Sequence, residues 1–416
     1  MMDNVSGILC VSITSSAAFA LNKNGPHGKI LTLHLFGTVF FGLIAALWIV
    51  QGMRAGFGMS RLPWLSAAPP LANGPVPLIS IIFAARDEAE KMPAALQTLV
   101  AQDYPRFEII AVNDRSQDRT SAILHDSART HKNLLVMDIA NLPPGWLGKP
   151  HALVKGYETS HGEWLVFTDA DVHFAPEVLR KALALALQQN WDHLSLLASV
   201  EMRGFWEITA ISYFGLGFVF GNEPWLASDP RSTRYVGVGA FQLVRRAAYE
   251  KSGGHSRLRM DVIEDMKLGK LMKKSGFRSG VAVAQDLVSV RWHAGVQNVI
   301  RGVTKNMFAA CHYNPLLAAA AMLLTLIMSV LPFFGLALAS GWARVFAGIA
   351  VCSAVVIHGG MIWATDASPL YGLTHPLGAL LFCWMLGRSA IATLWRGGVV
   401  WRDTFYPIEE LRKGLV

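Results

Sequence analysis

Long apolar stretches near both ends of the chain frame a central region with a shorter periodicity. Residues 30–53 contain one His and no Asp, Glu, Lys or Arg, the pattern of a helix long enough to span a bilayer. Three more apolar segments fall within residues 315–397. The pattern therefore predicts an N-terminal transmembrane helix, a globular domain over residues 78–314 and membrane segments after it.

The remaining segments are more polar. Residues 1–29 form a leader without a basic start, so a cleaved signal peptide is not expected. Residues 54–77 are rich in Pro and Ala and predict a linker, and residues 398–416 form a polar tail.

Strand-like and helix-like patterns alternate through the first half of the globular domain. Four short apolar runs are typical of buried strands: 78–85, 107–114, 133–139 and 163–172. Three segments have helical periodicity, the second with a Ser N-cap pattern at its start: 90–102, 116–130 and 175–189. This alternation predicts an α/β fold with a mostly parallel sheet, whose ligands lie beyond the carboxyl ends of the strands.

Composition places part of the chain in lipid. Charged residues make up 16% of the 416 residues and the mean hydropathy is +0.35, whereas soluble domains carry about 25% charged residues. The net charge of +8 comes from scattered Lys and Arg, which argues against nucleic-acid binding and fits a membrane protein that faces anionic lipid. The four Cys are far apart and indicate neither a disulfide framework nor a metal site.

Carboxylates follow two of the predicted strands. Asp169 and Asp171 follow at the end of the apolar run 164–167, and Asp114 ends another strand. Ionised acids beside an apolar strand require a compensating cation, and Mg²⁺ or Mn²⁺ favours carboxylate together with phosphate oxygens. Alternate residues of an extended segment point to opposite sides, so one Asp of the pair is expected to be the direct ligand. For an isolated Asp-x-Asp, capping or loop hydrogen bonding is the alternative.

Four stretches in order resemble the motifs of family 2 glycosyltransferases, whose fold is the GT-A (nucleotide-diphospho-sugar transferase) fold. They are "ISIIFAARDEAE" from residue 79, "AVNDRSQDRTSAIL" from 111, "EWLVFTDADV" from 163 and "GGHSRLRMDVIEDMKLGKLMKKSGFR" from 253. Two further stretches, "LPPGWLGKPHALVKG" and "GVGAFQLVRRAAYEKSGGH", look like the carotenoid- and hopanoid-associated branch of that family.

The resemblance implies a donor site at the carboxyl edge of the sheet. Asp87 and Glu88 match positions that meet the nucleotide, and Asp114 matches the carboxylate that reads the base. Lys149 would contact the diphosphate, and Asp169 would lie on the ribose side. Two of these residues have simpler alternatives, because Asp114 could cap a helix and Lys149 could be a solvated loop lysine.

The same resemblance implies the metal site and the base. Asp171, together with Asp169, matches the motif that binds Mg²⁺ or Mn²⁺. Asp265 matches the general base, which takes the proton of the acceptor hydroxyl during inverting transfer. Glu264 beside it is grouped with the substrate-binding residues, with a charge at a helix start as the alternative.

The chain departs from the family pattern in two places. Ala84 replaces the usual Pro after the first strand. Arg291 and Trp292 match the end of a Gln/Arg-x-x-Arg-Trp element that binds substrate, but Val288 replaces its first residue. The carotenoid-like branch also lacks the full element and has a Gly-x-x-Lys-Asn ending, which this chain matches with Gly302, Lys305 and Asn306.

Residues 205–227 are nearly as apolar as a transmembrane segment. They lie between the Asp pair and Asp265, which must share one site, so a single crossing is excluded. An interfacial or re-entrant segment is favoured over a buried core helix, because it would bring a lipid acceptor to the edge of the sheet.

These inferences predict an inverting, metal-dependent glycosyltransferase. Its donor would be a nucleotide sugar, most simply a UDP-sugar, and its acceptor a membrane lipid such as a carotenoid, a hopanoid or another glycolipid precursor. A polyprenyl-phosphate sugar synthase and a catalytically silent membrane scaffold are the alternatives.

Nucleotide sugars are cytosolic, so a multi-pass protein of the inner (plasma) membrane with a cytoplasmic catalytic domain is expected. Basic residues near the C-terminal end favour a cytoplasmic tail, whereas three full crossings would put the tail outside. Pro332 interrupts the first C-terminal segment and could turn it into a re-entrant hairpin, which would restore the cytoplasmic tail.

Overall fold

The central sheet has seven strands in the residues that the computed structural model describes, which are 26–71, 74–365, 367–402 and 404–415. The strand order is β3-β2-β1-β4-β8-β6-β9. The bounds are β1 (Ile79–Ala85), β2 (Phe107–Asp114), β3 (Leu134–Ile139), β4 (Trp164–Asp169), β6 (His193–Leu197), β8 (Gln242–Arg245) and β9 (Ser279–Val283). β8 runs antiparallel to β4 and β6, and the other neighbours are parallel. The predicted mostly parallel sheet is confirmed.

Apolar side chains alternate across β1 and build a core on each face of the sheet. Ile81 and Phe83 pack with helices α3 and α6, whereas Ile82 packs with helices α5, α8 and α9 on the other face. The helices of this domain are α3 (Met92–Val100), α4 (Thr120–Thr130), α5 (Gly148–Thr159), α6 (Val178–Gln188), α8 (Arg246–Ser252) and α9 (Glu264–Lys274).

Two local details differ from the sequence expectation. The hydrophobic pattern did not single out α5 as a helix. The N-cap position of α4 is Arg119, which makes no side-chain cap hydrogen bond, and the carboxylate of Asp118 accepts a hydrogen bond from the amide of Thr120, the first residue of α4, at 2.9 Å. Ser116 lies too far from the first turn to cap it, and its hydroxyl instead accepts a hydrogen bond from the amide of Asp87 at 3.0 Å.

Short elements connect the sheet domain to the membrane helices. A three-stranded sheet contains β5 (Val172–Phe174), β10 (Val288–Val290) and β7 (Ser199–Val200). It leads into α10 (Val296–Thr304) and α11 (Met307–Ala310). The 3-10 helices are η1 (Leu65–Ala67), η2 (Pro224–Leu226), η3 (Gly254–Leu258) and η4 (Pro369–Thr374).

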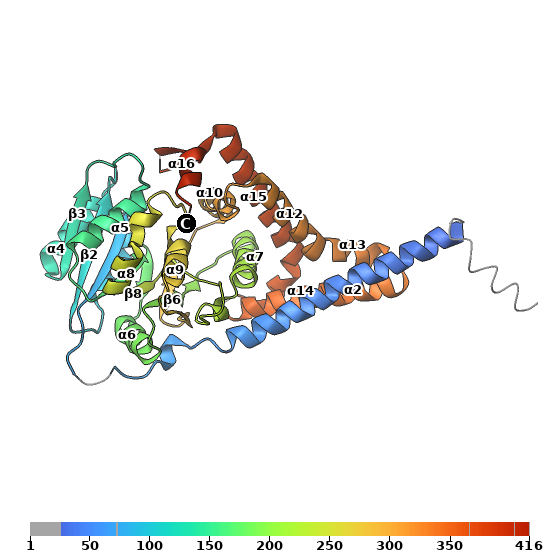
Figure 1. Cartoon of the computed structure of the whole chain (residues 1–416), viewed down its shortest axis with the longest axis horizontal. Helices are drawn as coiled ribbons and strands as arrows, with labels where there is room; N and C mark the ends of the chain where they lie inside the picture. The colour runs from blue at the N-terminus through green and yellow to red at the C-terminus, as the bar shows by residue number, and fades with distance from the viewer. Residues whose placement is uncertain (1–25, 72–73, 366, 403, 416) are drawn as a thin grey trace, which may run out of the picture.

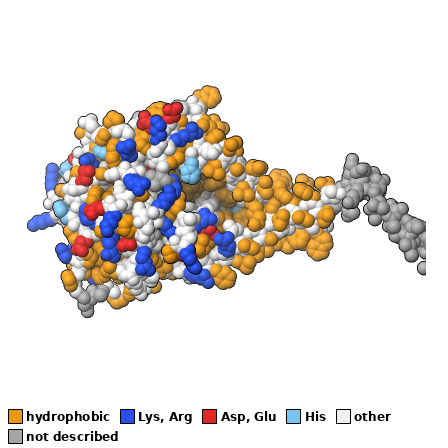
Figure 2. Space-filling view, viewed as in Figure 1, with side chains coloured by type: hydrophobic (Ala, Val, Ile, Leu, Met, Phe, Trp, Pro, Cys, Tyr) orange, Lys and Arg blue, Asp and Glu red, His pale blue; other side chains and the backbone are white. Residues whose placement is uncertain are grey.

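In the described part of the chain, four helical segments are long and apolar enough to cross a membrane: Thr32–Met59, Pro315–Leu338, Gly341–Trp363 and Pro369–Arg396. The first belongs to α2 (Pro26–Met59), and the others contain α12 (Pro315–Ser329) with α13 (Leu331–Leu338), α14 (Gly341–Trp363) and α15 (His375–Arg396). α2, α13 and α14 extend together from the sheet domain (Figure 1), and hydrophobic side chains cover this extension (Figure 2). The N-terminal leader lies outside the described residues up to residue 25.

Helix α7 (Phe205–Asn222) joins the sheet domain to the membrane helices. The hydroxyl of Ser212 lies 3.0 Å from Nε2 of His358 in α14, and the hydroxyl of Tyr213 lies 2.8 Å from that of Ser329 in α12. Residues 207–213 are buried, and the exposed large apolar side chains of α7 are Phe205 and Trp206 in its first turn. The stretch 207–213 of α7 therefore has the buried-helix arrangement. The interfacial placement stays a prediction and concerns the exposed first turn.

The C-terminal tail packs on the sheet domain. It contains β11 (Gly398–Trp401), β12 (Thr404–Pro407) and α16 (Ile408–Lys413). Arg402 pairs with Glu88 at 2.7 Å, and Arg412 donates a hydrogen bond to the carbonyl of Tyr313 at 2.8 Å. The tail and the sheet domain therefore lie on the same side of any membrane that the helices cross.

The reversal of direction in the C-terminal helices does not lie at Pro332. α12 and α13 lead away from the sheet domain and α14 leads back to it (Figure 1). The hydroxyl of Ser340, just before α14, lies 3.4 Å from Nδ1 of His34 near the distal end of α2. The turn therefore occurs at residues 339–340, because Pro332 stands in the first turn of α13 and is tolerated there.

This arrangement predicts which residues share a side of the membrane. In sealed cells that make a cysteine-free version of the chain, a membrane-impermeant maleimide should label S340C and leave T130C and K413C unlabelled until the cells are opened. All three positions are exposed, so burial does not decide the outcome. Labelling of T130C in sealed cells would contradict a cytoplasmic sheet domain. A difference in labelling between T130C and K413C would contradict the placement of the sheet domain and the tail on the same side of the membrane.

Candidate active site

The carboxyl edge of the parallel strands gathers the acids singled out in the sequence. Asp114 ends β2 and Asp169 ends β4, on either side of β1. Asp169 pairs in register with Ala84, and Asn113 pairs in register with Ala85. Because all three strands run in the same direction, the two carboxylates lie at the same edge of the sheet.

Lys149 connects two of these acids. Its ammonium lies 2.6 Å from Oδ1 of Asp169 and 2.7 Å from Oε1 of Glu264. Burial alone would lower the pKa of Lys149, but the carboxylates of Asp169 and Glu264 raise it well above its ordinary value. Lys149 therefore stays protonated, in the first turn of α5 and not in a solvated loop.

Asp265 lies beside Asp169 and is held there by Gly239. The amide of Gly239 donates to Oδ2 of Asp265 at 3.1 Å, and its carbonyl accepts from the amide of Asp169 at 2.9 Å. Burial raises the pKa of Asp265 to about 6, and the neighbouring Glu264 carboxylate adds to this shift while Lys149 opposes it. A carboxyl group with such a pKa can both accept and release a proton near neutral pH.

Asp171 faces a different cation. Its Oδ2 lies 3.1 Å from the ammonium of Lys91, which also donates to the carbonyl of Arg291 at 3.3 Å. Burial raises the pKa of Asp171, and the nearby Asp169 carboxylate raises it further. A carboxylate whose ionisation is disfavoured by a neighbouring carboxylate fits a divalent cation, which would relieve the repulsion.

The described residues contain no group of three or more His, Cys, Asp or Glu side chains that could hold a metal ion. Asp169 and Asp171 could therefore supply at most part of a coordination shell. Mg²⁺ commonly takes one or two carboxylates and completes its shell with substrate phosphates and water. The residues present fit a cation that arrives with a diphosphate.

Of the acids expected to bind the nucleotide, two form ion pairs with arginines and the third binds a backbone amide. Asp114 forms a two-point ion pair with Arg115 at 2.7 and 3.0 Å, and it does not cap a helix. Glu88 pairs with Arg402, and burial raises the pKa of Glu88. The carboxylate of Asp87 accepts a hydrogen bond from the amide of Gln117 at 2.7 Å, so Asp87 joins two loops.

The side chains of Arg291 and Trp292 do not contact Asp169, Asp171 or Asp265. The guanidinium of Arg291 lies 3.9 Å from Oε2 of Glu207 in α7. The ring of Trp292 packs on Phe214 and His293, with centroid distances of 5.1 and 4.9 Å. They fix the chain next to α7, and only the carbonyl of Arg291 reaches the site, through Lys91.

Lys305, Lys91 and Arg402 add positive charge to the site, and only the first of them belongs to a motif seen in the sequence. Lys305 belongs to the Gly-x-x-Lys-Asn ending, and its ammonium lies 4.1 Å from the ring centroid of Trp401. Burial lowers the pKa of Lys305 to about 8, although the Glu264 carboxylate opposes the shift. Lys91 and Arg402 were missed. Lys91 is one charge among several before α3, and Arg402 lies in a tail that no motif connected with the site.

The strand order and the acids at the carboxyl edge define a GT-A fold, the fold of nucleotide-diphospho-sugar transferases. Residues 80–212 match the family model "Glycosyl transferase family 2". The chain thus carries a family 2 glycosyltransferase domain and is an enzyme of the glycosyltransferase class.

Two curated relatives are similar over the sheet domain. The chain is 26% identical over 264 residues to 4,4'-diaponeurosporenoate glycosyltransferase of Staphylococcus haemolyticus, a match that covers 62% of this chain and 69% of the relative. It is 24% identical over 247 residues to the beta-monoglucosyldiacylglycerol synthase of Trichormus variabilis, over 56% of this chain and 50% of the relative. The match thus spans only half the length of the second relative.

One solved structure supports the fold. The mannosyltransferase PcManGT from Pyrobaculum calidifontis, in complex with GDP-Man and Mn²⁺, superposes with a TM-score of 0.51 at 19% identity. The superposition covers 86% of this chain and 99% of that one. At this identity the similarity establishes the fold alone.

The close approach of the two acids depends on the absence of a side chain at residue 239. A Cβ there would lie 2.6 Å from Oδ2 of Asp169 and 3.1 Å from Oδ2 of Asp265. We expect G239A to lower kcat by about 100-fold, because a displacement of about 1 Å in an active site has this effect. G217A is the matched control, since its Cβ meets nothing within 4 Å. Equal activity of the two variants in an assay of sugar transfer would show that the spacing of the acids is unimportant.

Proposed function

We propose that this protein transfers a sugar, with inversion at the anomeric carbon, from a nucleoside-diphosphate donor to a membrane lipid. The observation that carries the proposal is the position of Asp265, which shares Gly239 with Asp169. Lys305, near the start of the membrane helices, is close enough for the Glu264, Asp265 and Asp169 charges to act on it. One site can therefore receive a donor from the sheet edge and an acceptor from the membrane side.

In this reaction the acceptor oxygen forms a bond to the anomeric carbon as the bond from that carbon to the diphosphate oxygen breaks. Asp265 takes the proton of the acceptor hydroxyl, and the nucleoside diphosphate leaves with the electron pair of the broken bond. Lys149, which stays protonated, holds Asp169 and Glu264 in place and offers positive charge to the diphosphate. Mg²⁺ or Mn²⁺ held by Asp171 and Asp169 would supply charge neutralisation at the leaving group.

The identity of the donor base is part of the proposal. Asp114, paired with Arg115, and Glu88, paired with Arg402, match the positions of the family motif that meet the nucleotide. We propose a UDP-sugar as donor on the resemblance of these positions to the family motif. We further propose that the sheet domain faces the cytoplasm of a multi-pass inner-membrane protein, since nucleotide sugars are made there.

A polyprenyl-phosphate acceptor is the second candidate. A cavity beside Lys305 is lined by several cations, which favours an acceptor that carries negative charge. A phosphate nucleophile is already ionised near neutral pH, because its second pKa is about 6, so it has little need of a base. The two candidates therefore differ in how much they depend on Asp265.

The variant D265N tests the role of the base. It keeps the shape of the side chain but cannot accept a proton, so transfer should fall by about 100-fold or more while donor binding persists. Transfer to lipid extract from cells that lack the protein, followed by mass spectrometry, measures the first quantity, and calorimetric titration with the nucleotide sugar measures the second. Loss of both together would make Asp265 a binding residue. A small loss of transfer alone would favour the phosphate acceptor.

The raised pKa of Asp265 predicts a dependence on pH. A base works in its ionised form, which is lost as the pH falls through the pKa of about 6. We expect kcat/KM of the wild type to fall about tenfold per unit below that pH, because kcat/KM reports the free enzyme. A profile that is flat from pH 7 to pH 5 would contradict this role.

Metal removal and the variant D171A test the requirement for a divalent cation. After metal removal, transfer should be lost in excess chelator and restored by Mg²⁺ or Mn²⁺, and D171A should not be restored. E158Q, on the exposed end of α5, serves as the control for a lost surface carboxylate. Full transfer by the wild type in excess chelator would rule out the metal requirement.

A further inference from the structure

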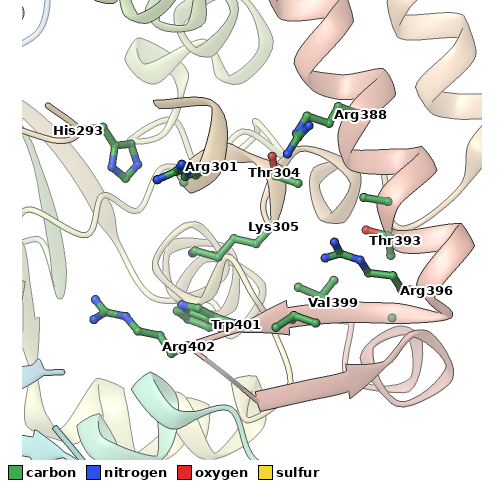
Figure 3. Close-up of a pocket in the computed structure, with 14 residues that line it drawn as sticks. His293, Arg301, Thr304, Lys305, Arg388, Thr393, Arg396, Val399, Trp401 and Arg402 are labelled. Carbon is green, nitrogen blue, oxygen red and sulfur yellow. The ribbon is translucent and has the colours of Figure 1, made fainter. Parts of the chain in front are cut away.

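A cavity of about 450 Å³ lies between α10, α15 and β11 (Figure 3). Among the described residues, the charged side chains that line it are all basic, and none is Asp or Glu. The cations come from three parts of the chain: Arg301 and Lys305 near α10, Arg388 and Arg396 on α15, and Arg402 on the tail. Like charges that converge on one space repel each other, so a ligand with negative charge would stabilise the arrangement.

Three of these arginines have no acidic partner in the described part of the chain. Arg301, Arg388 and Arg396 take part in none of its ion pairs, in contrast to Arg402, which pairs with Glu88. Their side chains border the same open space in Figure 3. The planar guanidinium binds phosphate and carboxylate at two points, so these side chains are suited to either anion.

An apolar hollow continues from the cavity along α15. It shares Arg388 and Arg396 with the cavity and adds Trp384, Ile391 and Trp395. Trp395 is 89% exposed and Ile391 is 66% exposed, on a helix that is apolar enough to lie in lipid. Basic residues beside exposed aromatic and aliphatic residues are typical of a membrane interface, where one end of a lipid is charged and the rest is apolar.

The inner wall of the cavity leads to the donor site. Lys305 contacts the ring of Trp401, and its charge is close enough to Glu264 and Asp265 for them to act on its pKa. Arg402 lines the cavity and also binds Glu88. A head group in the cavity would therefore lie next to the acids and to the expected position of the nucleotide.

We propose that this cavity binds the anionic group of the lipid acceptor, a phosphate or a carboxylate, while the lipid chain lies along the apolar hollow of α15. The inference rests on the proposed function, which it deepens by assigning a charge to the acceptor. The anionic group anchors the lipid, and the remainder of its head group reaches past Lys305 towards Asp265.

The test uses the full chain in a neutral maltoside detergent and simple probes. Native mass spectrometry measures the binding of dodecyl phosphate, dodecanoate, dodecanol and inorganic phosphate. We expect at least one of the two anionic amphiphiles to bind ten times more tightly than both dodecanol and inorganic phosphate. The tighter of the two identifies the anion as phosphate or carboxylate. If dodecanol binds as tightly as the anionic amphiphiles, the proposed role of charge is wrong. If inorganic phosphate binds as tightly as they do, the proposed role of the apolar hollow is wrong.

Variants locate the binding. The double variant R388Q/R396Q should weaken the binding of the anionic amphiphile at least tenfold. The variant R388K/R396K keeps the charge without the two-point geometry and should weaken this binding less. The control is R61Q, because Arg61 is an exposed arginine just after α2, outside the cavity. If R61Q weakens binding as much as R388Q/R396Q, charged amphiphiles bind through non-specific electrostatic attraction to the whole protein. The proposal would then be wrong.

The proposed function is tested separately in the same preparation. Binding of the nucleotide sugar to the wild type tests the sheet edge, which meets the cavity at Arg402. Its absence together with tight binding of dodecyl phosphate or dodecanoate would contradict the glycosyl transfer and leave the cavity as an anionic-lipid site. Binding of the nucleotide sugar together with weak binding of both amphiphiles would contradict the proposed role of the cavity but not the proposed function.

Discussion

The ammonium of Lys149 is the interaction on which the site depends. It lies between Asp169 and Glu264, with Asp265 close by, so three carboxylates share one fully charged neighbour. Without it, Asp169 and Glu264 would be left as partly buried charges without a cation, a loss that typically costs about 3–5 kcal/mol for a buried pair. The same ion pairs hold together the end of β4, the start of α5 and the start of α9, which are far apart in the sequence. Fold and site are therefore stabilised by one set of charges, and an incoming diphosphate enters an environment that already contains a fixed cation.

Much of the catalytic domain could be predicted from the sequence, because the physical signals were local. The apolar runs of β1 and β4 are buried on both faces, and the acids at their ends follow from the chain direction in a parallel sheet. The antiparallel strand β8 and the helix α5 gave weaker signals. α5 contains Pro150, His151 and two Gly, so its pattern did not stand out, although most of its residues are buried against the sheet.

The parts that could not be predicted depend on contacts between distant segments. Arg402 meets Glu88 across 314 positions of sequence, and the cations of the cavity come from helices that are adjacent only in the folded chain. The position of the membrane hairpin was also misjudged. Pro332 suggested the turn, but a proline in the first turn of a helix allows the helix to continue, and the chain reverses at the short break before α14.

The contact of the tail with the loop after β1 has a consequence for biosynthesis. Glu88 leaves the ribosome early, and its partner Arg402 follows only after the helices α12 to α15 have been made. Domains generally fold in order from the N-terminus during synthesis, so the sheet can form while this corner of the donor site still lacks its cation. Completion of the site is thereby linked to the insertion of the membrane helices. A chain that has not yet reached its lipid environment carries the acids of a glycosyltransferase without the full set of charges around them.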